Sequence, residues 1–268
     1  MRPDATRSEN ALDKFALLAM QSYNIGNCDG WFGVFRDGYF GMQSRLFGLR
    51  YHSKLLHSWP NPLDMIGYYP FYFHEHNASV MLFCMDSAIE CFVFALNALG
   101  QAVDNTGFHS VSDHRSLGKV SPKNVVHSEE KSRAPGYQKN FPSLQQHWAN
   151  NLAFLNLIFD NHDVTKHRQQ HNMGGRFSSD LPQSYLPLLG FPGGKEFAIG
   201  FAPAVEVYLP SNPKNKSNTI TGLNIHNLEA LETKFWEFIN ESIDLAVGDS
   251  RENISLNYET FQEQNSQR

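Results

Sequence analysis

Residues 148–171 read WANNLAFLNLIFDNHDVTKHRQQH, and this stretch predicts both the fold and the position of a functional site. Its first half carries apolar residues at steps of four, three and four, the spacing of one helix face: Trp148, Leu152, Leu155 and Phe159. At about 100° per residue, the same face then reaches His162, Asp163 and Lys166. Burial of an unpaired charge is costly, so a core face that becomes ionisable needs an explanation. We therefore expect a polar site at the end of this helix.

The rest of the chain is mainly helical in pattern. Apolar periodicity, N-cap residues and Pro or Gly breaks predict further helices at 10–26, 43–59, 77–103 and 227–247, beside one that spans 143–171. Residues 68–73 are expected to form an aromatic loop around Pro70, and 105–141 a long loop without periodicity. Alternating apolar residues predict a small β-hairpin near 196–209.

These elements predict a mainly α fold, an antiparallel helical bundle with the hairpin as an insertion. We expect one domain over residues 1–250, which includes the 105–141 loop, followed by a frayed polar tail at 251–268. The chain has 268 residues, 41% of them hydrophobic, which is typical of a globular protein. Its net charge of −5 disfavours a globally basic nucleic-acid binder.

Cysteine usage and the N-terminal sequence favour a cytoplasmic protein. Cys28, Cys84 and Cys91 have no metal-ligand spacing and are expected to be reduced thiols. Residues 1–10 are polar and lack a secretory signal. The most apolar run, 80–99, contains Asp86, Glu90 and Asn97, which favours a buried bundle helix over a membrane span.

The ionisable end of the 143–171 helix suits chemistry on phosphates. Asp163, His167 and His171 recur every four residues, so Asp163 can accept a hydrogen bond from His167 and favour its imidazolium. A positioned histidine beside Lys166 and Arg168 suits proton transfer or phosphate binding. The alternative is a solvated helix end, where basic side chains complement the helix dipole.

A metal site is a second interpretation of the same segment. His167 and His171 place two imidazoles on one helix face, but the pair lacks the glutamate of the HExxH motif. A third ligand would have to come from another part of the chain, for example residues 74–76.

Two other clusters are candidates for supporting roles. Arg45 and Arg50 lie on a basic stripe of the 43–59 helix that could contact phosphates. Asp86 and Glu90 form a polar stripe on the 77–103 helix, which is either solvated or reaches the histidines of the 143–171 helix. The chain has no P-loop, nucleophile elbow, dinucleotide fingerprint or CxxC pair, so the corresponding enzyme classes have no support.

Residues 160–168, DNHDVTKHR, resemble the short motif of the HEPN superfamily, helical-bundle proteins of bacterial toxin, defence and stress systems. His167 would match the motif histidine, whereas Asp160 or Asn161 stands where the family has arginine. The resemblance covers the helices at 77–104 and 143–171 and, at its widest, the last helix, about a third of the chain. It implies metal-independent RNA cleavage in a cleft between two protomers, where histidine activates the 2′-hydroxyl and arginine steadies the phosphate.

These observations predict a cytoplasmic HEPN-like protein of bacterial defence, stress or toxin–antitoxin systems that binds RNA or nucleotide phosphate. We expect weak or absent ribonuclease activity, no cofactor, no membrane association and a homodimer. The expected catalytic residues are Asn161, Asp163, Lys166 and His167; the phosphate ligands are Lys166, Arg168, Arg45 and Arg50; the supporting residues are His162, Asp86 and Glu90. The alternatives are a metal-dependent hydrolase that uses His167 and His171, and a non-catalytic interaction protein.

Overall fold

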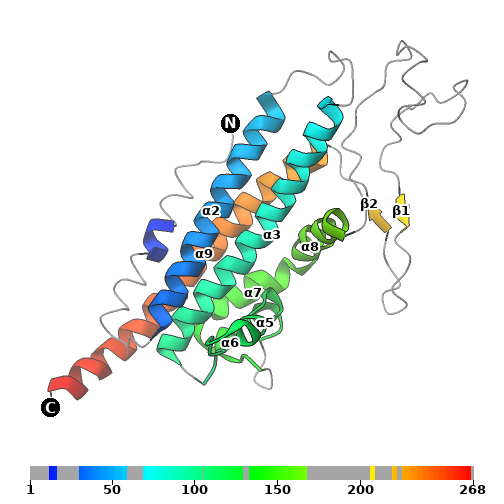
Figure 1. Ribbon diagram of the computed structural model, residues 1–268. Helices are drawn as coiled ribbons and strands as arrows, with labels where there is room; N and C mark the ends of the chain where they lie inside the picture. Colours follow the sequence, from blue (N-terminus) through cyan, green and yellow to red (C-terminus); the bar gives the residue numbers. More distant parts are fainter. Residues whose placement is uncertain are drawn as a thin grey trace, which may run out of the picture. The chain divides into compact units, whose positions relative to one another are not determined.

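The structure is a computed structural model that describes residues 12–16, 30–58, 69–104, 106–128, 133–167, 206–208, 219–221 and 225–266. Residues 12–16 are helical. The long helices are α2 (Trp31–Ser58), α3 (Tyr69–Val103), α8 (Leu152–His167) and α9 (Ile225–Ser266) (Figure 1). The shorter ones are α4 (His114–Leu117), α5 (Pro122–Val126), α6 (Gly136–Asn140) and α7 (Pro142–Asn150). The prediction of a mainly helical bundle is confirmed for these residues.

The described helices group into two compact units. The first comprises Met1–Phe47, Cys84–Ile158 and Glu232–Arg268, and the second comprises Gly48–Phe83 and Phe159–Leu231. The helices α2, α3, α8 and α9 each contribute residues to both units. The single domain expected over 1–250 stays a prediction.

In the first unit, α2 and α3 are antiparallel and packed closely at two glycines. A Cβ atom on Gly38 would lie 2.8 Å from the backbone nitrogen of Ala95, and one on Gly41 would lie 2.9 Å from the Sγ of Cys91. Glycine is unfavourable inside a helix, which is why the sequence predicted a start only near residue 43. The structure places that start at Trp31, because these glycines let the two backbones approach.

The same unit holds α7 antiparallel to α9. The indole N–H of Trp148, a fully buried residue, donates to the hydroxyl of Ser242 at 2.9 Å. The ring of Trp148 also packs against Phe92 and Phe238, with centroids 6.1 Å and 5.5 Å away. This buried aromatic contact joins α3, α7 and α9 into one core.

The predicted helix over 143–171 is two helices. Asn151 separates α7 from α8 with φ −104° and ψ 16°, and its backbone N–H bonds to the carbonyls of His147 and Trp148. The break turns the apolar face of α8, so that Phe154, Leu155 and Ile158 are buried whereas Leu152 and Phe159 are only partly buried. The prediction that Leu152 and Phe159 lie at the centre of the buried helix face is therefore wrong.

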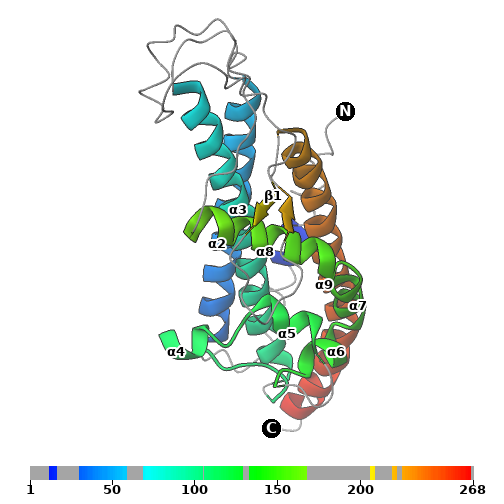
Figure 2. The same ribbon diagram turned by 90° about the vertical axis from the view of Figure 1, so that its right-hand side faces the viewer.

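The segment 105–141, expected as a loop, contains α4, α5 and α6. Figure 2 shows α5 and α6 close to α7, and these three helices contact one another. Phe108 fills the space beside Gly100 and Gly136, where any Cβ would lie 2.4 Å from its ring. Its ring meets the buried Tyr137 edge-on at 5.0 Å. These helices are too short to show a repeated spacing of apolar residues, so the sequence pattern could not predict them.

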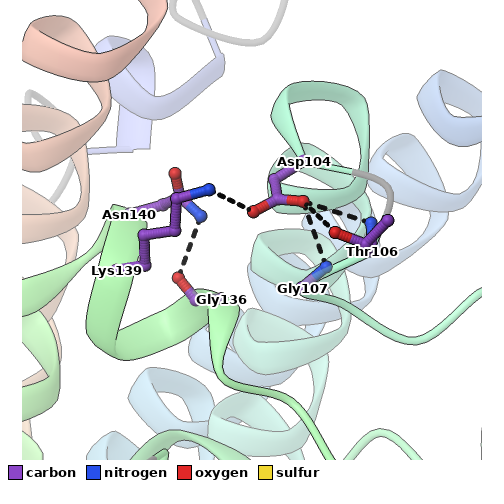
Figure 3. Close-up of polar contacts among 6 residues, drawn as sticks. All are labelled: Asp104, Thr106, Gly107, Gly136, Lys139 and Asn140. Carbon is purple, nitrogen blue, oxygen red and sulfur yellow. Dashed lines mark hydrogen bonds and ion pairs between the residues drawn. The ribbon is translucent and has the colours of Figure 1, made fainter. Parts of the chain in front are cut away.

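The carboxylate of Asp104 links the two ends of the 105–141 segment (Figure 3). Asp104, just after α3, accepts hydrogen bonds from the backbone N–H groups of Thr106 and Gly107 at 3.1 and 3.2 Å. Its other oxygen lies 2.9 Å from the Nζ of Lys139 on α6. These donors hold the pKa of Asp104 well below its usual value, with the Lys139 hydrogen bond as the largest cause.

Two further predicted helix ends differ from the structure. The helix α3 begins at Tyr69, so the expected loop at 68–73 is wrong: Pro70 lies in the first turn, where no backbone N–H is needed. The helix α9 passes Gly248, where a stop was expected, and continues to Ser266. The frayed tail expected at 251–268 stays a prediction.

The hairpin expected within 196–209 is not supported. The strand β1 (Glu206–Tyr208) pairs antiparallel with β2 (Thr219–Thr221), with Val207 opposite Ile220. Residues 196–205 lie outside the described part of the chain. Alternation predicts that a segment is a strand, but it does not identify the partner strand.

One described helix is long and apolar enough to span a membrane by length and composition, at His76–Ala102 of α3. More than half of its most apolar window is buried inside the protein, as is also found in core helices of soluble proteins. This similarity makes the feature weak evidence for a membrane span.

Candidate functional site at the end of helix α8

The last turns of α8 bury two of the predicted site residues, in the second unit. Asn161 is 0% exposed and His162 is 8% exposed, whereas Asp163 is exposed. The imidazole of His162 lies edge-on to the ring of Phe83, with centroids 5.6 Å apart. Ile158 is followed on the buried face by Asn161 and His162, three and four residues later. The prediction that polar residues continue the core face is correct for His162 and wrong for Asp163.

Two carboxylates, those of Asp160 and Asp163, lie beside this buried pair in the sequence. The pKa of Asp160 is raised above its usual value by partial burial and, to a smaller extent, by the negative charge of Asp163. The two residues are three apart, so they lie on neighbouring positions of the helix surface. An anionic ligand would bind here more easily when Asp160 is protonated.

The basic residues of the predicted site come soon after Asp163 in the sequence. Lys166 and His167 belong to the last turn of α8, four residues after His162 and Asp163 respectively. Their side chains lie outside the described residues, as do Arg168 and His171. The expected hydrogen bond between Asp163 and His167 and the metal pair His167 and His171 therefore stay predictions.

The two expected phosphate ligands on α2 have different environments. Arg45, in the first unit, donates from Nε to the hydroxyl of Ser87 at 3.1 Å. It lies near the free thiols of Cys84 and Cys91. Burial raises the pKa values of both thiols, and the positive charge of Arg45 offsets part of this increase. Arg50 is partly buried and belongs to the second unit. Arg45 thus has a structural role in joining α2 to α3.

The supporting acids lie on α3 in the first unit. Asp86 is partly buried and Glu90 is exposed, so the expected polar stripe is partly solvated. His162 belongs to the second unit. The approach of either acid to His162 stays a prediction.

Two histidine contacts in the second unit were not predicted. His57 lies with Nδ1 at 2.6 Å from the carbonyl oxygen of Ser53 and with Nε2 at 2.6 Å from a carboxylate oxygen of Glu229. Each ring nitrogen of His57 thus has an oxygen partner at hydrogen-bond distance, one on α2 itself and one on α9. His52 bonds through Nδ1 to the side-chain oxygen of Asn77 at 2.7 Å.

The sequence could indicate only part of these contacts. Ser53 and His57 have helical i to i+4 spacing, but Glu229 is 172 residues away. Among the residues that the structure describes, no group of three or more His, Cys, Asp or Glu side chains could hold a metal ion.

Comparison of the chain with protein-family models, curated proteins and solved structures gave no match.

Proposed function

We propose that the end of α8 binds the phosphate groups of RNA or of a nucleotide, in a HEPN-like bundle with weak or absent metal-independent ribonuclease activity. The supporting observation is the burial of Asn161 and His162 where the core face of α8 ends. Polar side chains at such positions are costly unless they have partners or a role. In the proposal, this buried pair fixes the end of α8, and the basic residues come next in the sequence.

The proposed roles follow from the spacing of these residues in the sequence. Lys166 and Arg168 supply positive charge for the phosphate, and Asp163 holds the imidazole of His167 in one orientation. Where RNA is cleaved, His167 takes the proton of the 2′-hydroxyl as that oxygen attacks the neighbouring phosphate. The protein would act as a homodimer in the bacterial cytoplasm, in defence or stress, and α3 would be a core helix rather than a membrane span.

The carboxylates set the expected pH dependence. Asp160 and Asp163 repel a phosphate when both are ionised, and the raised pKa of Asp160 brings its protonation closer to neutral pH. Phosphate binding should therefore strengthen as the pH falls from 7.5 towards 5. This dependence is the opposite of that expected for a metal site, whose ligands lose affinity when protonated.

The test is fluorescence anisotropy with a labelled single-stranded RNA, repeated with a labelled nucleotide, at low and at physiological salt. We expect Lys166→Gln to weaken binding at least about fivefold and to reduce its salt dependence. Lys123→Gln, a change of an exposed lysine on α5, is the matched control and should leave binding unchanged. No RNA or nucleotide binding at low salt, or equal affinity of the Lys166 and control variants, would contradict the proposal.

Cleavage is tested separately with the same RNA. Any activity should be lost in His167→Ala and should persist in EDTA. Activity that EDTA abolishes would favour the metal-dependent hydrolase with His167 and His171 instead.

A non-catalytic interaction protein is the second candidate function, and a specific observation favours it. Phe40, Phe47 and Tyr51 on α2 are 57%, 71% and 51% exposed. Exposed aromatic side chains in such a group are typical of protein-binding surfaces.

A further inference from the structure

Two histidines on different helices of the second unit face each other. His52 lies on the C-terminal part of α2 and His76 on the N-terminal part of α3, where the two helices run side by side (Figure 1, Figure 2). Their imidazole rings have centroids 6.3 Å apart and are inclined at 75° to each other. Imidazole is the commonest metal ligand in proteins, so this facing pair is a candidate metal site.

The side chain of Asn77 determines which nitrogen of His52 can bind a metal. Its Oδ1 lies 2.7 Å from Nδ1 of His52. An amide oxygen only accepts hydrogen bonds, so this contact places a hydrogen on Nδ1 and leaves the lone pair of the neutral imidazole on Nε2. Metal-binding histidines commonly donate from one ring nitrogen to an oxygen in this way and bind the metal through the other. Asn77 is 1% exposed, so the acceptor is held in the core.

The second histidine is accessible from solvent. His76 is exposed, and no residue in the described part of the chain forms a hydrogen bond with its imidazole. An ion can therefore reach a nitrogen of His76 without displacing a protein partner.

The separation of the two rings is close to that of two ligands on one ion. A zinc–nitrogen bond is about 2.0–2.1 Å long, so two imidazoles on the same ion have centroids roughly 5–6 Å apart. The observed 6.3 Å is slightly longer, and rotation of the exposed His76 side chain closes the difference. The cations Arg50 and Lys54 are each two residues from His52, which puts them on the opposite side of α2.

We propose that His52 and His76 bind one zinc or copper(II) ion, through Nε2 of His52 and one ring nitrogen of His76. These ions favour imidazole ligands, whereas magnesium and calcium favour oxygen. Two protein ligands leave further coordination positions to water, so the ion would join α2 to α3 without being enclosed. This proposal does not depend on RNA binding, and the site is separate from the pair His167 and His171.

The first experiment titrates the full chain with zinc and with copper(II) by isothermal titration calorimetry. We expect His52→Gln and His76→Gln each to raise the dissociation constant at least about tenfold. His127→Gln is the matched control, because it changes an exposed histidine at the C-terminal cap of α5, and it should leave the dissociation constant unchanged. Magnesium should not compete with either ion.

Electron paramagnetic resonance of the copper complex identifies the ligands directly. The unaltered chain should show splitting from two imidazole nitrogens, and His76→Gln should remove one of them. His76 is exposed, so this variant does not disturb the core, and the spectrum separates the loss of a ligand from a loss of folding.

The second experiment examines the role of Asn77 as a positioning residue. In the metal-free chain at neutral pH or above, long-range proton–nitrogen NMR should find the hydrogen of neutral His52 on Nδ1. Asn77→Ala should remove this preference and weaken zinc binding about tenfold to a hundredfold.

Three results would overturn the proposal. The first is that the unaltered chain binds neither zinc nor copper(II). The second is that His52→Gln and His76→Gln leave metal binding unchanged, which would place the ion on other histidines. The third is that the hydrogen of neutral His52 lies on Nε2 in the metal-free chain.

Discussion

The carboxylate of Asp249 on α9 accepts a hydrogen bond from the backbone N–H of Leu144, in the first turn of α7, at 3.1 Å. Asp249 is 7% exposed, so the α9 helix supplies a buried N-terminal cap for a helix more than a hundred residues earlier. The negative charge also complements the positive end of the α7 dipole.

Removal of this cap should destabilise the protein. Asp249→Ala leaves the Leu144 N–H without its acceptor and should lower the free energy of unfolding by about 1–3 kcal/mol. Asp249→Asn keeps an acceptor oxygen and should cost less. Urea denaturation followed by circular dichroism measures both, and equal losses in the two variants would mean that the hydrogen bond is not what stabilises α7.

Two glycines on α2 should respond oppositely to the same substitution. Gly38→Ala places a Cβ 2.8 Å from the backbone of Ala95 and should destabilise the protein by about 1–3 kcal/mol. Nothing lies within 4 Å of a Cβ at Gly33, so Gly33→Ala should stabilise the protein by about 0.5–1 kcal/mol. Thermal unfolding of the two variants tests the close contact between Gly38 and Ala95. If both substitutions change the melting temperature in the same direction, this interpretation is wrong.

Asp104 should make stability depend on pH. Its pKa is lower in the folded chain than in the unfolded one, so its contribution is full above about pH 4 and is lost as the pH falls through the folded value. The difference in unfolding free energy between the unaltered protein and Asp104→Asn should therefore shrink below pH 4.

Two further variants separate the contacts of Asp104. Lys139→Gln removes only the ion pair, and Asp104→Ala removes also the bonds to Thr106 and Gly107. Asp104→Ala should be the most destabilising of the three changes. If the difference in unfolding free energy between the unaltered protein and Asp104→Asn does not vary with pH, the charge of Asp104 is not the source of its stabilising effect.

His147 should act in a different pH range. Burial lowers its pKa, partly offset by Glu241, and its ring stacks on Phe238 at 5.0 Å. The unfolded chain then binds a proton near pH 6.5 more readily than the folded one, so stability falls as the pH decreases through that value. His147→Phe keeps an aromatic ring on Phe238 and should reduce this loss. Urea denaturation between pH 7.5 and 5 compares the two proteins, and equal slopes would exclude His147 as the cause.

Local patterns predicted the helices more accurately than their ends. The buried side of α3 and the burial of Trp148 follow from apolar periodicity, which depends on neighbouring residues. Pro70 and Gly248 misled the prediction because each residue is compatible with a helix in its own position, the first turn and an exposed site respectively. Asn151 was missed as a break, since asparagine is not a strong breaker in isolation.

For the candidate site, the sequence identified the segment but not its surroundings. The polar residues at the end of α8 were predicted, and His162 is buried as expected. Its neighbour Phe83 and the partners Ser242, Glu229 and Asp249 come from distant parts of the chain. Such contacts depend on how helices pack, which periodicity along one helix does not encode.

The side chain of Asn97 makes the pair of backbone hydrogen bonds that a neighbouring β-strand would otherwise make. Its Nδ2 donates to the carbonyl of His109 at 2.7 Å, and its Oδ1 accepts from the His109 N–H at 3.1 Å, so one amide satisfies both backbone groups of a single residue. Asn97 is 0% exposed, and the connection between the two residues is anchored at both ends. The length of this connection is therefore constrained: an insertion or deletion between positions 97 and 109 would separate the amide from its backbone partner.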